Sequence, residues 1–114
     1  MMKPLLLGAG LLLAACTNLP TPTARLDLAD ALAARQGWQR VPIPSGTFEL
    51  AAYIPRTHNT GDALTVYIEG DGLAWISPSQ PSLDPTPNNP IGLKLALVNP
   101  EGNAAYLARP CQYV

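Results

Sequence analysis

The chain has 114 residues, 47% of them hydrophobic and 13% charged, a composition that argues against a disordered protein. Its length allows at most one small domain. The formal net charge is −1 and no cluster of basic residues occurs, which argues against nucleic acid as a partner.

The first 15 residues have the pattern of a secretory signal peptide. Lys3 provides a positive start, residues 4–13 form an apolar run too short to cross a membrane, and residues 13–16 read LAAC. This tetrapeptide resembles the lipobox of bacterial lipoproteins, which implies that Cys16 is acylated and becomes the N-terminus after cleavage. We therefore expect a lipid anchor in a bacterial cell envelope, on the periplasmic side, with the bilayer as partner. The alternative is an ordinary secretory peptide in which the cysteine occurs by chance.

A proline-containing tether and a helix follow this segment. Small polar residues and prolines predict an unpacked lipidated tether over residues 16–23, and Thr23 is the expected N-cap of a helix over 24–36. We expect Leu28, Leu32 and the alanines to form one apolar face and Gly37 to end the helix. Its charges do not form a basic face, so packing on a sheet is favoured over packing on a membrane.

Two strands joined by a short turn are expected next. Residues 38–43 and 48–54 are rich in apolar residues and flank a Pro-Ser-Gly turn, a pattern typical of an antiparallel pair. Pro42 limits the first strand to an edge of the sheet. Residues 55–62 then read as a polar loop.

Residues 64–72 contain the candidate site. The β-branched and aromatic residues of 64–68 predict a buried strand, covered on both faces. Gly70 and Gly72 then free the backbone, so that the amides of Asp71 and Gly72 can point into one small volume that holds an oxyanion. The alternative is a plain turn between two elements.

The rest of the chain predicts a loop, a helix and a strand. Trp75 lies in an apolar patch and either lines a substrate pocket or, as we favour, belongs to the core. A proline-rich, lid-like loop over 77–89 ends at Asn89, the expected N-cap of a helix over 91–98. Residues 103–107 are expected to form a buried strand parallel to the strand at 64–68.

These motifs together resemble one enzyme superfamily. Residues 68–72 resemble the loop after the third strand of α/β-hydrolases, which supplies an oxyanion-hole amide. Residues 67–75, the proline-rich loop and residues 106–114 are similar to a group of bacterial α/β-hydrolase-like lipoproteins. The resemblance implies that Asp71 and Gly72 act catalytically as backbone donors, on a small ester-like substrate of the complete protein.

The resemblance also bears on Cys111 and His58. In the resembled lipoproteins a second cysteine follows shortly after this point, which implies a disulfide from Cys111 to a partner outside the chain. The alternative is a buried free thiol. His58 precedes the oxyanion-like strand, whereas hydrolases of this type place their histidine after the nucleophile, so we expect a solvated loop histidine.

The catalytic triad itself is missing from the sequence. No Gly-x-Ser-x-Gly motif occurs, and no metal or other cofactor is expected, because Glu69, Asp71 and Asp84 lack a recognisable ligand spacing. We therefore predict that residues 24–114 are the N-terminal part of a longer serine hydrolase. Its fold would be an incomplete α/β-hydrolase sheet, made of an antiparallel hairpin and a parallel βαβ unit.

Two consequences follow from this prediction. The chain alone should be inactive, and the strand at 64–68, paired only with that at 103–107, should leave an apolar edge that promotes association. The alternative is a non-enzymatic envelope lipoprotein that acts as a small binding or structural module.

Overall fold

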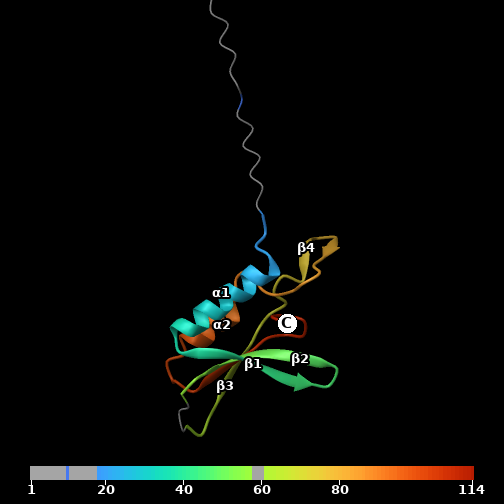
Figure 1. Ribbon diagram of the computed structural model, residues 1–114. Coiled ribbons are helices and arrows are strands. Elements are labelled where there is room, and N and C mark those ends of the chain that lie inside the picture. The colour runs from blue at the N-terminus through green and yellow to red at the C-terminus, as the bar shows by residue number, and fades with distance from the viewer. Residues whose placement is uncertain (1–9, 11–17, 58–60) are drawn as a thin grey trace, which may run out of the picture.

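The computed structural model describes residue 10, residues 18–57 and residues 61–114. Cys16, His58 and all but one residue of the predicted signal peptide lie outside the described residues. The elements in chain order are α1 (Pro22–Arg35), β1 (Trp38–Ser45), β2 (Phe48–Pro55), β3 (Thr65–Ile68), β4 (Trp75–Ser77), β5 (Gln80–Pro81), α2 (Ile91–Leu97) and β6 (Ala104–Leu107) (Figure 1).

A mixed four-stranded sheet in the order β1-β2-β6-β3 forms the centre of the α/β fold. β1 is antiparallel to β2 with Trp38 opposite Pro55, β2 is antiparallel to β6, and β6 is parallel to β3. The predicted hairpin and parallel βαβ unit are thus confirmed. β1 is an edge strand, which accommodates Pro42. Among the described residues β3 pairs only with β6, so the predicted unpaired edge of β3 is also confirmed.

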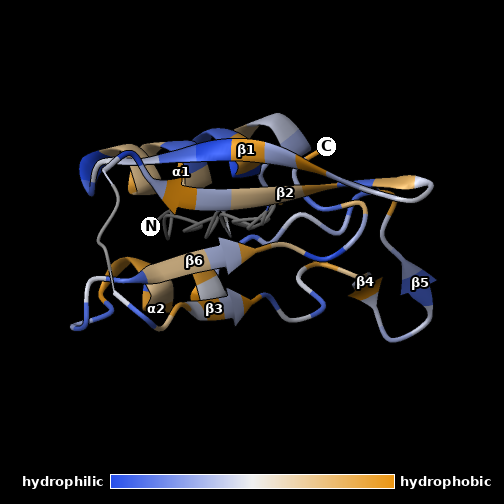
Figure 2. Cartoon of the chain, turned by 90° about the horizontal axis from the view of Figure 1, so that it is seen from below, coloured by the Kyte–Doolittle hydropathy of each residue, from blue (hydrophilic) through white to orange (hydrophobic). Residues whose placement is uncertain are grey.

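Both helices lie on the same face of this sheet (Figure 1). The core between the two layers contains Ala29 and Ala33 of α1, Leu93 and Ala96 of α2, and Tyr53, Tyr106 and other residues of the strands. Figure 2 views the molecule from below, with the helices behind the strands.

The expectation that β3 is buried on both faces is wrong. Tyr67 packs against the core beneath the helices, whereas Val66 and Ile68 are 46% and 65% exposed. Alternate residues of a strand point to opposite faces, so these two side chains lie on the face without helices. No described element covers them there.

α1 begins earlier than the sequence predicts, and its predicted apolar face is only partly the one that is buried. The cap is Thr21, whose Oγ1 accepts a 3.1 Å hydrogen bond from the Ala24 amide, and Pro22 occupies the first turn, where the missing N–H has no cost. Arg25 and two alanines are buried, while Leu28 is exposed. The alanines let the helix approach the sheet closely. None of the described helices is long and apolar enough to span a membrane.

Candidate functional site

A hollow of ≈ 430 Å³ lies where β3 ends, between the following loop and α2. In open α/β sheets, ligands bind at the carboxyl ends of the strands. The hollow is lined by Ile68, Glu69, Gly70, Gly72, Asn89, Ile91, Gly92 and Leu95. The candidate loop, residues 69–72, therefore borders it.

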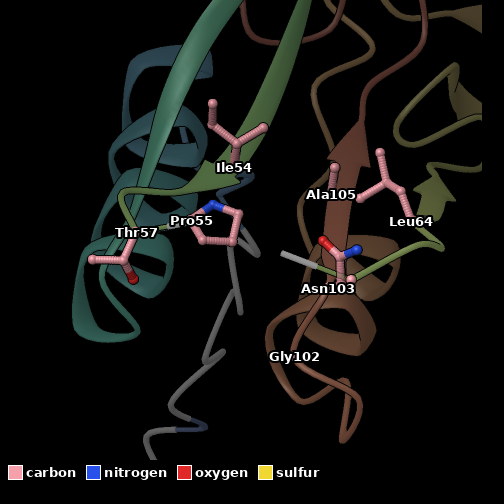
Figure 3. Close-up of a pocket in the computed structure, with 9 residues that line it drawn as sticks. Ile54, Pro55, Thr57, Leu64, Gly102, Asn103 and Ala105 are labelled. Atoms are coloured by element: carbon pink, nitrogen blue, oxygen red, sulfur yellow. The ribbon is translucent and has the colours of Figure 1, made fainter. Parts of the chain in front are cut away.

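A second hollow of ≈ 320 Å³ lies near the amino ends of β3 and β6 (Figure 3). Ile54, Leu64 and Asn103 are among the residues that line it. It lacks the glycine loop and lies at the strand end that α/β sheets use less for ligands. The hollow beside residues 69–72 is therefore the better candidate.

Gly72 cannot be replaced in this loop without a clash. Its φ is +61°, and a Cβ atom there would lie 2.2 Å from the Pro85 carbonyl oxygen and 2.7 Å from Gln112 Nε2. Pro85 is held next to Gly72, because the Leu73 amide donates a 3.0 Å hydrogen bond to the same Pro85 oxygen. A glycine is therefore needed at this position both for the left-handed backbone conformation and for the close contact with Pro85 and Gln112.

The amides of Asp71 and Gly72 have no hydrogen-bond acceptor among the described residues. The Gly70 amide, in contrast, donates to Glu69 Oε1 at 3.1 Å. Gly72 borders the hollow, whereas Asp71 does not. The Asp71 carboxylate is exposed and pairs with Arg109 at 3.2 Å, a surface contact of small energetic value. The loop therefore offers two free main-chain donors.

Glu69 has a structural role that the sequence did not indicate. Its side chain is buried, with the residue 7% exposed. Oε2 accepts a hydrogen bond from the Tyr106 hydroxyl at 2.8 Å, and Oε1 accepts from the Gly92 amide at 3.2 Å as well as from Gly70. Gly92 lies in the first turn of α2, so Glu69 caps this helix from the neighbouring strand.

The prediction that Asn89 is the N-cap of α2 is therefore wrong. The N-cap position is Pro90, which has no side-chain hydrogen bond, and the Asn89 side chain instead accepts a hydrogen bond from Lys94. Gly92 leaves room for Glu69 to cap α2 in place of Asn89, because a Cβ atom at this position would lie 3.1 Å from Glu69 Oε1. The three groups that donate hydrogen bonds to Glu69 belong to separate parts of the chain, and no local sequence pattern predicts these bonds.

Three buried tyrosines, Tyr53, Tyr106 and Tyr113, lie beneath the site and are called the tyrosine cluster. Their ring centroids are 5.8 to 6.4 Å apart. Burial raises the pKa of all three hydroxyls above the ordinary value. The Tyr53 hydroxyl donates to Asp30 at 2.6 Å, and the Tyr113 hydroxyl has no partner among the described residues.

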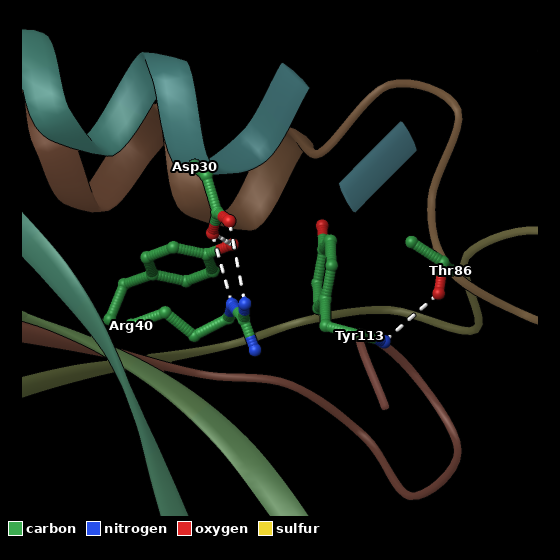
Figure 4. A network of polar contacts seen from close by, with 5 residues as sticks. Asp30, Arg40, Thr86 and Tyr113 are labelled. Carbon is green, nitrogen blue, oxygen red and sulfur yellow. Dashed lines mark hydrogen bonds and ion pairs between the residues drawn. The ribbon is translucent and has the colours of Figure 1, made fainter. Parts of the chain in front are cut away.

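Asp30 links this cluster to the surface. Arg40 Nε lies 3.0 Å from Asp30 Oδ1 (Figure 4), and the hydrogen bond to this carboxylate raises the pKa of Arg40. Asp30 thus accepts from both Tyr53 and Arg40, and it joins α1 to the first two strands.

The C-terminal segment, residues 109–114, contacts the candidate loop and the segment around Thr86. Gln112 Nε2 donates to the Gly70 carbonyl at 3.1 Å, and its Oε1 accepts from the Arg109 amide at 3.0 Å. The Tyr113 amide donates to Thr86 Oγ1 at 2.9 Å (Figure 4). Arg25 of α1 in turn donates to the Thr86 carbonyl at 2.8 Å. The loop is therefore fixed by buried polar contacts within the described chain.

Two other candidate residues lie at the surface. Trp75 is 60% exposed, so the favoured interpretation as a core residue is wrong; it lies in β4, which pairs only with β5 within the described chain, and it does not border the hollow at Gly72. Cys111 is an exposed free thiol with φ +70°, so it is not buried. A disulfide to a partner outside the chain stays a prediction.

The described residues contain no group of three or more His, Cys, Asp or Glu side chains placed to hold a metal ion. The chain matches no protein-family model, no curated protein and no solved structure.

Proposed function

We propose that the chain is the N-terminal part of a membrane-anchored serine hydrolase of the carboxylester type. In this proposal the amides of Asp71 and Gly72 form part of the oxyanion hole. The observation that carries it is a pair of amides without an acceptor among the described residues, in a loop that Gln112 and Pro85 hold at the carboxyl end of a parallel strand. Such donors stabilise the negative charge that develops on a carbonyl oxygen, and the loss of one typically slows catalysis by about 10²- to 10³-fold.

The remaining catalytic groups would come from further strands that this sheet adds at β3. Two observations support this: the free edge of β3, and the exposure of Val66 and Ile68 on the face without helices. Burying a Val or Ile side chain fully contributes about 1.5–3 kcal/mol, so a covering layer would stabilise the sheet substantially. The chain as given has no Gly-x-Ser-x-Gly nucleophile motif.

The anchor in this proposal is Cys16, on the strength of the LAAC tetrapeptide after a short apolar run. The matched variant is Cys16→Ser, which is similar in size and shape but has no sulfur to acylate. The native protein should sediment with membranes and show the acyl mass on its N-terminal peptide. The variant should appear in the soluble periplasmic fraction.

Activity-based labelling tests the hydrolase itself. Membranes from the native host are treated with a fluorophosphonate probe, which reacts with activated serines, and labelled proteins are digested with trypsin. The expected result is a labelled protein that yields the tryptic peptide 41–56 of this chain together with a Gly-x-Ser-x-Gly peptide. The purified 114-residue chain should be unlabelled and should not hydrolyse a nitrophenyl ester. Peptide 41–56 found only in unlabelled protein would refute the proposal.

A second candidate is a non-enzymatic envelope lipoprotein that binds a small oxyanion, such as a carboxylate, at the same loop. One observation favours it: Gln112 and Pro85, both among the described residues, hold the two ends of the loop by hydrogen bonds to Gly70 and Leu73. The labelling experiment separates the two candidates, since only the enzyme reacts with the probe.

A further inference from the structure

The β4–β5 hairpin, residues 73–85, is an apolar projection from the domain. Trp75, Ile76 and Leu83 are all exposed, Leu83 completely. No charged residue occurs from Gly72 to Leu83. The hairpin is closed by hydrogen bonds from the Leu73 amide to Pro85 and from the Ser82 amide to Ala74, and β4 pairs only with β5 among the described residues. Three large apolar side chains exposed on one short, uncharged hairpin are consistent with an interaction surface.

The base of this hairpin is attached to the beginning of α1, where the tether joins the domain. Arg25 Nη1 donates to the carbonyls of Asp84 at 3.4 Å and Thr86 at 2.8 Å. Pro22 and Thr23 line a small cleft together with the same two residues. In Figure 1 residues 18–21, which precede α1, and the hairpin lie at the same end of the domain.

The tether and the hairpin also have similar reach. Five residues lie between Cys16 and Pro22, and the six residue-to-residue steps from one to the other span at most about 20 Å when fully extended. From its closing pair at Leu73 to Pro78, the hairpin advances by five residues, or about 17 Å at the rise of a strand. If acyl chains hold Cys16 at the bilayer surface, a tether shorter than full extension lets the hairpin enter the interfacial layer as far as Trp75 and Leu83, which lie two residues from its closing pair.

We propose that the β4–β5 hairpin docks on the lipid bilayer in which Cys16 is anchored, with Trp75 and Leu83 in the interfacial layer. This inference rests on the proposed lipid anchor. Tryptophan is favoured at membrane interfaces, where its ring meets both apolar chains and polar headgroups. Because the hairpin is uncharged up to Leu83, its docking depends on apolar contact rather than on anionic lipid.

Fluorescence quenching in vesicles tests the docking. The acylated chain is reconstituted in phosphatidylcholine vesicles whose acyl chains carry bromine, which quenches nearby tryptophan. The chain has two tryptophans, and Trp38 is buried in the core, so it serves as an internal reference. Quenching should be strong in the native chain, should largely disappear in Trp75→Phe and should persist at high salt.

Two charge substitutions provide a matched comparison that leaves both tryptophans in place. Leu83→Glu should reduce bromine quenching at least about threefold, because a carboxylate on the hairpin opposes insertion. Phe48→Glu places the same charge on an exposed residue next to the turn of the β1–β2 hairpin and should leave the quenching unchanged.

The intact mass of the same sample separates the two proposals. A chain with the acyl mass but equal quenching in native protein and Trp75→Phe overturns the docking and leaves the anchor standing. A chain without the acyl mass overturns the anchor. Protection of Trp75 from aqueous iodide without bromine quenching means that protein covers the hairpin, which also overturns the docking.

Discussion

Gly72→Ala should destabilise the folded chain by about 3 kcal/mol, the sum of a backbone effect and two weakened contacts. Alanine at φ +61° costs about 1 kcal/mol. Its Cβ would lie 2.2 Å from the Pro85 oxygen, so the loop must move by about 1 Å to restore normal contact. That movement disrupts the 3.0 Å bond from Leu73 to Pro85 and the 3.1 Å bond from Gln112 to Gly70, each contributing about 1 kcal/mol.

Gly46→Ala is the matched control for this substitution. Gly46 has the same φ of +61°, but a Cβ atom there meets nothing within 4 Å, so only the backbone cost of about 1 kcal/mol applies. Urea unfolding of dilute protein, followed by tryptophan fluorescence, should separate the variants by about 2 kcal/mol. Equal destabilisation of the two variants would refute the close packing of the loop against Pro85 and Gln112.

Three further predictions concern the tyrosines and the sheet edge. The raised pKa values mean that the tyrosine cluster keeps its protons in the folded protein at a pH where the unfolded chain has released them. The free energy of unfolding should therefore fall as pH rises above about 10, by about 1.4 kcal/mol per pH unit for each tyrosine. Tyrosinate absorbance should appear only when the protein unfolds, and its appearance in the folded protein would contradict this prediction. Tyr106→Phe leaves the buried Glu69 carboxylate without its hydroxyl donor and should lower the free energy of unfolding in urea by about 1–3 kcal/mol. Tyr53→Phe should cost less, because Asp30 still accepts a hydrogen bond from Arg40 in that variant. A larger loss in Tyr53→Phe would contradict the role given to Glu69. Val66→Lys should reduce self-association through β3 in sedimentation velocity, whereas Phe48→Lys should not.

Local sequence signals were sufficient for the order and pairing of the main strands. The turn around Gly46, with its positive φ, and the proline in β1 indicated an antiparallel edge pair. A strand, a loop, a helix and a second apolar strand predicted the parallel pair of β3 and β6, because such crossovers follow one hand. Gly37, with φ +73°, ended α1 as expected.

The sequence misled where burial depends on what other parts of the chain cover. The apolar composition of β3 suggested a strand covered on both faces, but coverage is decided by helices that pack on one face only. Trp75 was assigned to the core because it lies in an apolar patch of the sequence, yet among the described residues its strand pairs only with β5, outside the main sheet. Leu28 was expected on the apolar face of α1 but is exposed, whereas Arg25 is buried because its guanidinium finds carbonyl acceptors at Asp84 and Thr86.

The candidate site was predictable in its backbone and not in its side chains. Two glycines around Asp71 were enough to indicate a loop with free amides. The role of Glu69 depends on a hydroxyl from β6 and an amide from α2, which are 37 and 23 residues away in sequence. Because these bonds occupy both carboxylate oxygens, the side chain of Glu69 serves the architecture of the loop. The chemistry that residues 69–72 can offer a ligand is therefore that of the main-chain donors.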